Sequence, residues 1–222
     1  MEHSDKKLSY EVQPSVGWYR VTHAVFTALF RTFWPLRIEG REHVPREGAA
    51  VIVSNHLSLI DPFVVGYGSD RPVSFMGKQE LFRVPVLRFW IRKLGSFPVD
   101  RSRRDPAALR TALTLLKNGE LLGMFPEGTR STTGEMLELR AGAARLAART
   151  RAPIIPAAVI NTDHALPKGK FIRPARIGVR FGPAFELTEL YGRNDKGDEM
   201  ERALEMIRVR IDDLHRDQNP GS

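Results

Sequence analysis

A histidine and an aspartate stand five residues apart in the segment 55–61 (NHLSLID), directly after the apolar run 49–53. An imidazole without perturbing neighbours titrates near pH ~6.5, so at neutral pH it can take a proton from a hydroxyl group. A nearby carboxylate fixes the tautomer of the imidazole and stabilises the imidazolium that forms. This pair of residue types predicts a general base, His56, assisted by Asp61.

The spacing of five limits how the two side chains can meet. Residues five apart on one ideal helix point roughly 140° away from each other, so a strand end and a turn must intervene. Two arrangements are open. Either Ser58 caps a helix whose first turn contains Asp61, or Asp61 is itself the cap and Pro62 takes the first helical position. The alternative is that Asp61 only caps a helix and His56 lies nearby without a shared task.

A second segment combines groups that recognise phosphate. The apolar run 121–125 predicts a buried strand, and it leads directly into PEGTRSTTG at 126–134. Backbone N–H groups at Gly128, the Thr129 hydroxyl and the forked guanidinium of Arg130 together suit a phosphate dianion. The sequence therefore predicts an anion site at the exit of a second strand.

With both segments in view, the sequence resembles the glycerophospholipid acyltransferases, and among them the 1-acyl-glycerol-3-phosphate acyltransferases that make phosphatidic acid. Four blocks occur in the family's order: NHxxxxD at 55–61, GSFPVDR at 95–101, FPEGTRS at 125–131 and APIIPAAV at 152–159. The resemblance covers residues 36–183. One departure is Arg140, because the family usually carries lysine before the Gly-Ala pair, although arginine keeps the charge.

The resemblance implies a role for each residue of these blocks. His56 and Asp61 would be the catalytic pair, with Asn55 and Ser58 in support. The groups that would bind the substrate phosphate are Glu127, Gly128, Thr129, Arg130, Arg101 and Lys78. Arg130 would supply the main charge, and each charge-assisted hydrogen bond of this kind contributes about 1.5–3 kcal/mol.

The implied reaction is a single acyl transfer without an acyl-enzyme. The acyl group would pass from acyl-CoA or acyl-carrier protein to the free sn-2 hydroxyl of lysophosphatidic acid, which gives phosphatidic acid. These thioesters are co-substrates, so we expect no cofactor and no metal. We expect no nucleic-acid partner, and acyl length, donor and oligomeric state leave no mark in the sequence.

Composition is compatible with this assignment. The chain has 222 residues and no cysteine, which excludes a cysteine nucleophile and a thiolate metal site. Lys and Arg total 34 against 26 acidic residues, a net charge of +8, which favours anionic partners such as a phospholipid surface. We expect the protein at the cytoplasmic face of the cell membrane, as a peripheral or monotopic protein.

A candidate membrane helix lies near the N-terminus. No stretch reaches the ~20 apolar residues that span a bilayer, but residues 18–36 gather six large aromatics between basic residues. This pattern predicts an amphipathic helix lying in the interface, and residues 81–94 are a second candidate to dock beside it. The alternative is a helix packed on the protein's own core. We expect residues 1–35 to form a tail and membrane helix, and residues 36–222 to form the acyltransferase domain.

Apolar runs alternate with helical patterns along the chain, which predicts an α/β fold: a mixed sheet of about seven strands flanked by helices, as the resemblance also implies. Expected strands are 37–39, 49–54, 73–76, 96–99, 121–125, 154–160 and 176–181, and expected helices are 62–68, 84–94, 106–117, 141–149 and 199–215.

Other function classes make different predictions. A relative with the same blocks would acylate another lysophospholipid or glycerol-3-phosphate. A basic module that binds membrane surfaces without catalysis explains the charge but not the Glu-Gly-Thr-Arg loop. A metal-dependent phosphoesterase with His56 and Asp61 as ligands lacks support, because the other histidines show no ligand spacing beside acidic residues.

Overall fold

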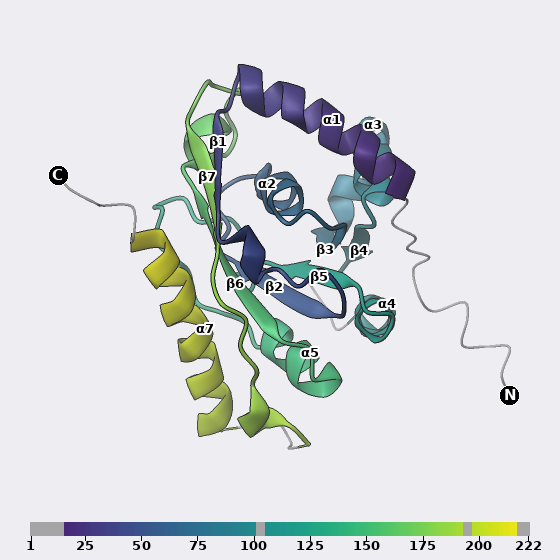
Figure 1. The fold of residues 1–222 in the computed structure, drawn as a ribbon, viewed down its shortest axis with the longest axis vertical. Coiled ribbons are helices and arrows are strands. Elements are labelled where there is room, and N and C mark those ends of the chain that lie inside the picture. The colour runs from purple at the N-terminus through teal and green to yellow at the C-terminus, as the bar shows by residue number, and fades with distance from the viewer. Residues whose placement is uncertain (1–15, 101–104, 193–196, 217–222) are drawn as a thin grey trace, which may run out of the picture.

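The computed structural model describes residues 16–100, 105–192 and 197–216, which form a central sheet with helices on both faces (Figure 1). The strands are β1 (Leu36–Glu39), β2 (Ala50–Ser54), β3 (Val73–Lys78), β4 (Phe97–Val99), β5 (Leu121–Met124), β6 (Ile154–Ile160) and β7 (Ile177–Phe181). The α-helices are α1 (Val16–Thr32), α2 (Asp61–Gly68), α3 (Pro85–Lys93), α4 (Pro106–Lys117), α5 (Gly142–Thr150), α6 (Thr162–Ala165) and α7 (Asp198–Arg216), and short 3-10 helices are η2 (Arg41–His43), η3 (Gln79–Arg83) and η4 (Thr188–Leu190).

The order of the strands brings distant parts of the sequence to one edge of the sheet. The order is β1-β7-β6-β2-β5-β3-β4, and every neighbouring pair is parallel except β6 and β7. The carboxyl ends of parallel strands meet at the same edge, where α/β proteins bind their ligands. The segments that follow β2, β3, β4 and β5 therefore leave the sheet side by side.

Strand β2 shows how the sheet separates two apolar cores. Its side chains alternate in direction, as the two-residue period of a strand requires. Val51 and Val53 belong to the core under α4, α5 and α7, whereas Ala50 and Ile52 belong to the core under α1 and α2. Helices α1 and α7 accordingly lie on opposite sides of the sheet (Figure 1). A strand buried on both faces reads as a continuous apolar run, which is how β2 appears in the sequence.

The predicted fold class is confirmed. All seven expected strands and the five expected helices are present, each within two residues of the predicted bounds. The short helix α6 and the 3-10 helices were not predicted, because segments of three to five residues are too short to show a helical period.

Helix α1 uses its large aromatic side chains against the rest of the protein. Trp18 lies edge-on to Phe89 of α3, Phe26 packs on Phe63 of α2, and Phe30 is buried. These three aromatic side chains therefore lie within the protein's own fold, as the alternative to an interfacial helix requires, whereas Val21, Val25 and Phe33 are 42–50 % exposed. Among the described residues no helix combines the length and apolarity needed to cross a bilayer. Membrane contact by α1, and a domain boundary at residue 35, stay predictions.

Candidate active site

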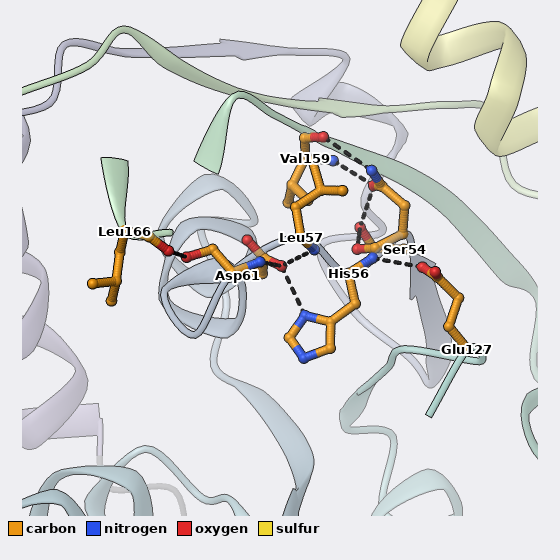
Figure 2. A network of polar contacts seen from close by, with 9 residues as sticks. Ser54, His56, Leu57, Asp61, Glu127, Val159 and Leu166 are labelled. Atoms are coloured by element: carbon orange, nitrogen blue, oxygen red, sulfur yellow. Dashed lines mark hydrogen bonds and ion pairs between the residues drawn. The ribbon is translucent and has the colours of Figure 1, made fainter. Parts of the chain in front are cut away.

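His56 and Asp61 meet at the carboxyl end of β2, as their residue types predict. Strand β2 ends at Ser54 and helix α2 begins at Asp61, so the five-residue spacing is bridged by a turn. His56 Nδ1 lies 2.7 Å from Asp61 Oδ2 (Figure 2). The Asp61 side chain is fully buried and the His56 side chain is 12 % exposed, so the histidine alone reaches the surface of the site.

The Asp61 carboxylate also holds the turn that carries His56. Its Oδ2 atom accepts the backbone N–H groups of Leu57 and Ser58, both at 2.7 Å. A carboxylate oxygen only accepts, so Nδ1 of His56 carries the proton and Nε2 keeps its lone pair. The Oδ1 atom is buried and has no hydrogen-bond partner in the described part of the chain. The arrangement leaves Nε2 ready to take a proton.

The predicted capping of helix α2 was wrong in both of its forms. The N-cap residue is Ile60, and no side chain caps the helix. Ser58 Oγ instead donates to the carbonyl oxygen of Leu166 at 2.8 Å, because the fold brings a distant carbonyl within reach. Asp61 takes the first helical position, and its carboxylate turns back toward residues 57 and 58. This bond joins the turn after His56 to Leu166, and the predicted supporting role of Ser58 stays a prediction.

Glu127 holds the backbone of His56. The strand β5 ends beside β2, and the Glu127 carboxylate that follows it accepts the His56 N–H at 2.7 Å through Oε1 (Figure 2). Its Oε2 atom accepts the Leu137 N–H at 2.9 Å. Burial raises the pKa of Glu127 above its ordinary value, although these two backbone N–H groups oppose the effect. Both oxygens are thus engaged by backbone groups, which makes Glu127 a positioning residue.

The support of Glu127 extends to the C-terminal helix. Arg208 on α7 donates to the carbonyl oxygens of Met136 at 3.3 Å and of Leu137 at 2.7 Å. Leu137 thus receives a bond from α7 through its carbonyl and gives one to Glu127 through its N–H. A continuous series of hydrogen bonds therefore runs from α7 to the loop that carries His56. No feature of the local sequence around Arg208 indicates this role.

Asn55 fixes the other side of the loop. Its side-chain amide pairs with the backbone of Val159 in β6, donating to the carbonyl oxygen at 3.1 Å and accepting the N–H at 2.8 Å. Ser54 Oγ donates to the Asn55 side-chain oxygen as well. These bonds continue the pairing of β2 with β6 past the end of the strand. Asn55 thus fixes the loop to β6 through two hydrogen bonds, and its predicted effect on catalysis stays a prediction.

An aromatic stack sets the plane of the His56 ring. Phe125 lies parallel to His56 with ring centroids 4.2 Å apart, and Phe75 lies parallel to Phe125 at 5.7 Å. Gly123 makes room for this stack, since a Cβ atom there would come within 2.2 Å of the Phe75 ring. Sequence reasoning placed Phe125 in a strand and missed its contact with the histidine.

The predicted phosphate loop lies against the catalytic loop. The N–H of Ser131 donates to the carbonyl oxygen of His56 at 2.8 Å. Gly128 has a φ of +69°, and the side chain of Arg140 lies over it, so that a Cβ atom there would come within 3.0 Å of Arg140 Nε. Arg130 has no hydrogen bond or ion pair to any residue of the described segments, and Thr129 is exposed. The turn thus carries Arg130 and Arg140, the second of which the sequence singled out only as a departure.

The two remaining predicted cations are Lys78 and Arg101. Lys78 ends β3 and forms an ion pair with Glu80 at 3.1 Å, with more than half of its side chain exposed. Arg101 lies outside the described residues. A metal centre is absent from the described segments, where no cluster of three potential ligands occurs. The roles of Lys78 and Arg101 in phosphate binding stay predictions.

An apolar cavity with a volume of about 110 Å³ opens beside His56. Its walls come from helices α1, α2 and α3 and from strand β3, and Lys78 lies on the same lining. The lining side chains include Phe26, Leu59, Phe63, Tyr67, Phe75, Met76, Leu81, Phe82, Ile91 and Phe125. His56, a set of apolar side chains and Lys78 therefore line one cavity.

The comparison with known proteins agrees with this geometry. The family model described as Acyltransferase matches residues 35–160, which is more than half of the chain. The chain belongs to the acyltransferase family. This assignment confirms the resemblance that the four sequence blocks indicated.

Named relatives within the acyltransferase family share one description. A 1-acyl-sn-glycerol-3-phosphate acyltransferase of Bacillus subtilis is 35 % identical over 55 % of this chain and 61 % of its own. A protein of the same name from Limnanthes douglasii is 32 % identical over 79 % of this chain and 63 % of its own. These matches therefore cover less than two thirds of each relative.

A solved acyltransferase has the same fold. The crystal structure of the 1-acyl-sn-glycerophosphate acyltransferase PlsC from Thermotoga maritima superposes with a TM-score of 0.71 and 26 % identity. The match covers 93 % of this chain and 80 % of the Thermotoga chain. The mixed sheet with flanking helices is thus the fold of this acyltransferase.

Proposed function

We propose that the protein transfers a fatty acyl group to the free sn-2 hydroxyl of lysophosphatidic acid, giving phosphatidic acid. One observation carries the proposal: His56, bonded to the buried Asp61, lines an apolar cavity whose lining also includes Lys78. An apolar cavity suits a fatty acyl chain, and the cation suits a phosphate. The names of the relatives support the same activity.

The reaction follows from the orientation of the imidazole. The Nε2 atom of His56 takes the proton of the acceptor hydroxyl while the hydroxyl oxygen attacks the thioester carbonyl. The tetrahedral intermediate collapses, the C–S bond breaks, and the thiolate leaves with the proton that the imidazolium returns. The Asp61 carboxylate stabilises the imidazolium in between. The chain supplies a general base worth typically 10²–10⁴ in rate, and holding both substrates in line supplies more.

The phosphate of the acceptor would be held by several cations, of which Lys78 lines the cavity. Arg130 is our first choice, because its guanidinium has no partner among the described residues and follows the turn next to His56. Lys78 and Arg101 complete the set, and Arg140 joins it because its side chain lies over Gly128. Thr129 and the Gly128 backbone would add hydrogen bonds.

The donor and the location are part of the same proposal. A thioester of CoA or of acyl-carrier protein would supply the acyl group, and no cofactor or metal takes part. The acceptor resides in a membrane, so the protein would work as a peripheral or monotopic protein on an anionic phospholipid surface at the cytoplasmic face. The net charge of +8 favours that surface.

A direct assay tests the proposal. The purified protein should transfer radiolabelled acyl groups from acyl-CoA to lysophosphatidic acid in the presence of a chelator. His56→Ala should abolish transfer while the circular dichroism spectrum is unchanged. A matched control is His164→Ala, which removes an exposed histidine far along the chain. Full activity of His56→Ala, or transfer to other acceptors but not to lysophosphatidic acid, contradicts the proposal.

A further inference from the structure

The loop between α6 and β7 exposes apolar side chains to an unusual degree. Phe171 is 91 % exposed and Ile172 is 61 % exposed, the two highest fractions among the large apolar residues described. Adjacent large apolar side chains that project from a folded protein mark a surface that contacts another apolar phase or a partner. Packing in the protein's own core therefore does not account for these two side chains.

Basic residues surround these two side chains. Lys168, Lys170, Arg173 and Arg176 are all exposed, and none forms an ion pair with a described residue. The sequence contains no acidic residue between Asp163 and Glu186. Exposed apolar side chains flanked along the chain by cations complement an anionic bilayer. Its headgroups attract the cations, and its acyl region accepts the apolar side chains.

Hydrogen bonds hold the base of the loop in place. Arg173 donates its backbone N–H to Ala165 at 2.8 Å and accepts the indole N–H of Trp34 at 2.7 Å through its carbonyl oxygen. Lys170 closes a turn with Pro167 through a backbone bond of 3.1 Å. Because the base is already ordered, insertion of the tip requires little new ordering of the backbone.

The same loop connects to the catalytic turn. Leu166, where the loop begins, accepts the hydrogen bond of Ser58, which lies two residues after His56 (Figure 2). Through Trp34 the loop also adjoins the start of β1, at the end of the molecule where α1 stops (Figure 1). A bilayer bound at this loop would lie next to the segment that carries the general base.

We propose that residues 168–176 form a membrane-insertion loop, in which Phe171 and Ile172 enter an anionic bilayer and the four cations bind its headgroups. The inference rests on the proposed function in that a lipid acceptor is drawn from a bilayer. It differs from the predicted role of α1, because it assigns the contact to a loop whose two large apolar side chains are mostly exposed.

The absence of cysteine in the chain allows a clean test. Phe171→Cys, labelled with the fluorophore NBD, should shift to the blue and brighten severalfold on vesicles of phosphatidylglycerol and phosphatidylcholine. Vesicles of phosphatidylcholine alone should give a much smaller change. The matched control is Val209→Cys on α7, where an apolar side chain is 46 % exposed on the other side of the sheet. An unchanged spectrum at position 171, or an equal change at position 209, overturns the inference.

A second variant separates membrane insertion from catalysis. Phe171→Ser combined with Ile172→Ser should weaken binding to the anionic vesicles by about tenfold or more. The same variant should keep its activity on a short-chain lysophosphatidic acid that is soluble in water. If the labelled Phe171→Cys protein inserts into the vesicles but the wild type transfers no acyl group, the loop stands and the proposed function fails. If the double variant still binds vesicles, or if light scattering shows that it has lost a dimer of the wild type, the loop is not a membrane contact.

Discussion

Substitution of Glu127 by glutamine tests whether the positioning of His56 limits catalysis. The carboxylate accepts two backbone N–H groups, at 2.7 Å from His56 and 2.9 Å from Leu137. A glutamine side chain offers one acceptor oxygen and one NH₂ donor, so in either orientation one of these N–H groups faces another donor. The change removes one hydrogen bond and leaves a buried donor without a partner.

The magnitude follows from that count. An unsatisfied buried donor costs about 1–3 kcal/mol, and each ~1.4 kcal/mol corresponds to a factor of ten in rate. If this cost falls on the arrangement of the catalytic loop, kcat should decrease by roughly 5- to 150-fold. The KM for lysophosphatidic acid should change little, because the Glu127 oxygens are engaged by backbone groups rather than facing a ligand.

The assay is steady-state acyl transfer at a saturating concentration of donor, with the acceptor varied. Glu138→Gln is the matched control, because Glu138 is exposed on the same loop. A kcat within twofold of the wild type would refute the positioning role. An increase in KM without a change in kcat would instead support the phosphate contact that the sequence predicted for Glu127.

The pH dependence of stability gives an independent measure. Because burial raises the pKa of Glu127 above its ordinary value of 4.5, the native state holds this proton to a higher pH than the unfolded state does. The free energy of unfolding should therefore fall as the pH rises from 4.5 through the raised value. Glutamine does not titrate, so the difference between wild type and Glu127→Gln should change across this window in urea denaturation and be constant above it. A constant difference throughout contradicts the assignment.

Three further substitutions separate other parts of the site. Asp61→Asn should keep the fold, since its oxygen can still accept the backbone bonds, but it should lower kcat by about 10²–10⁴ because the imidazolium loses its counter-charge; single-turnover kinetics and thermal unfolding check both. Arg130→Ala should raise the KM for lysophosphatidic acid roughly 10- to 150-fold with a smaller effect on kcat, as expected from a lost charge-assisted bond of about 1.5–3 kcal/mol, and a kinetic titration of the acceptor measures it. Gly123→Ala should destabilise the protein by about 1–3 kcal/mol, because its Cβ atom would displace the Phe75 ring, and calorimetry should record a lower Tm.

The parts of the molecule that the sequence predicted share a local signal. Strands such as β2 and β6 are continuous apolar runs, and His56 and Asp61 lie close in the chain, so their types and spacing were informative. Contacts between distant segments left no such signal. The pairing of Asn55 with Val159 joins residues 104 positions apart, and it depends on a strand order that no local pattern encodes.

The wrong prediction of the helix cap has its origin in tertiary structure. Serine is a residue type that often caps helices, but the Ser58 hydroxyl instead donates to the carbonyl oxygen of Leu166, which is 108 residues away in the chain. The contacts of Trp18 with Phe89 and of Phe26 with Phe63 likewise join α1 to helices far along the chain, while membrane contact by α1 stays a prediction. These contacts join segments that lie far apart in the sequence, so no local pattern encodes them.

The hydrogen bond between Arg208 and the backbone of Leu137 means that the arrangement of the site depends on helix α7. A fragment trimmed to residues 35–160, where the family match lies, would keep His56, Asp61, Glu127 and Arg130 and yet lose the anchor that α7 provides. Such a fragment would hold every reacting group without the frame that aligns them. Transplanting the motifs into another scaffold would therefore require a group that replaces the hydrogen bond from Arg208 on α7.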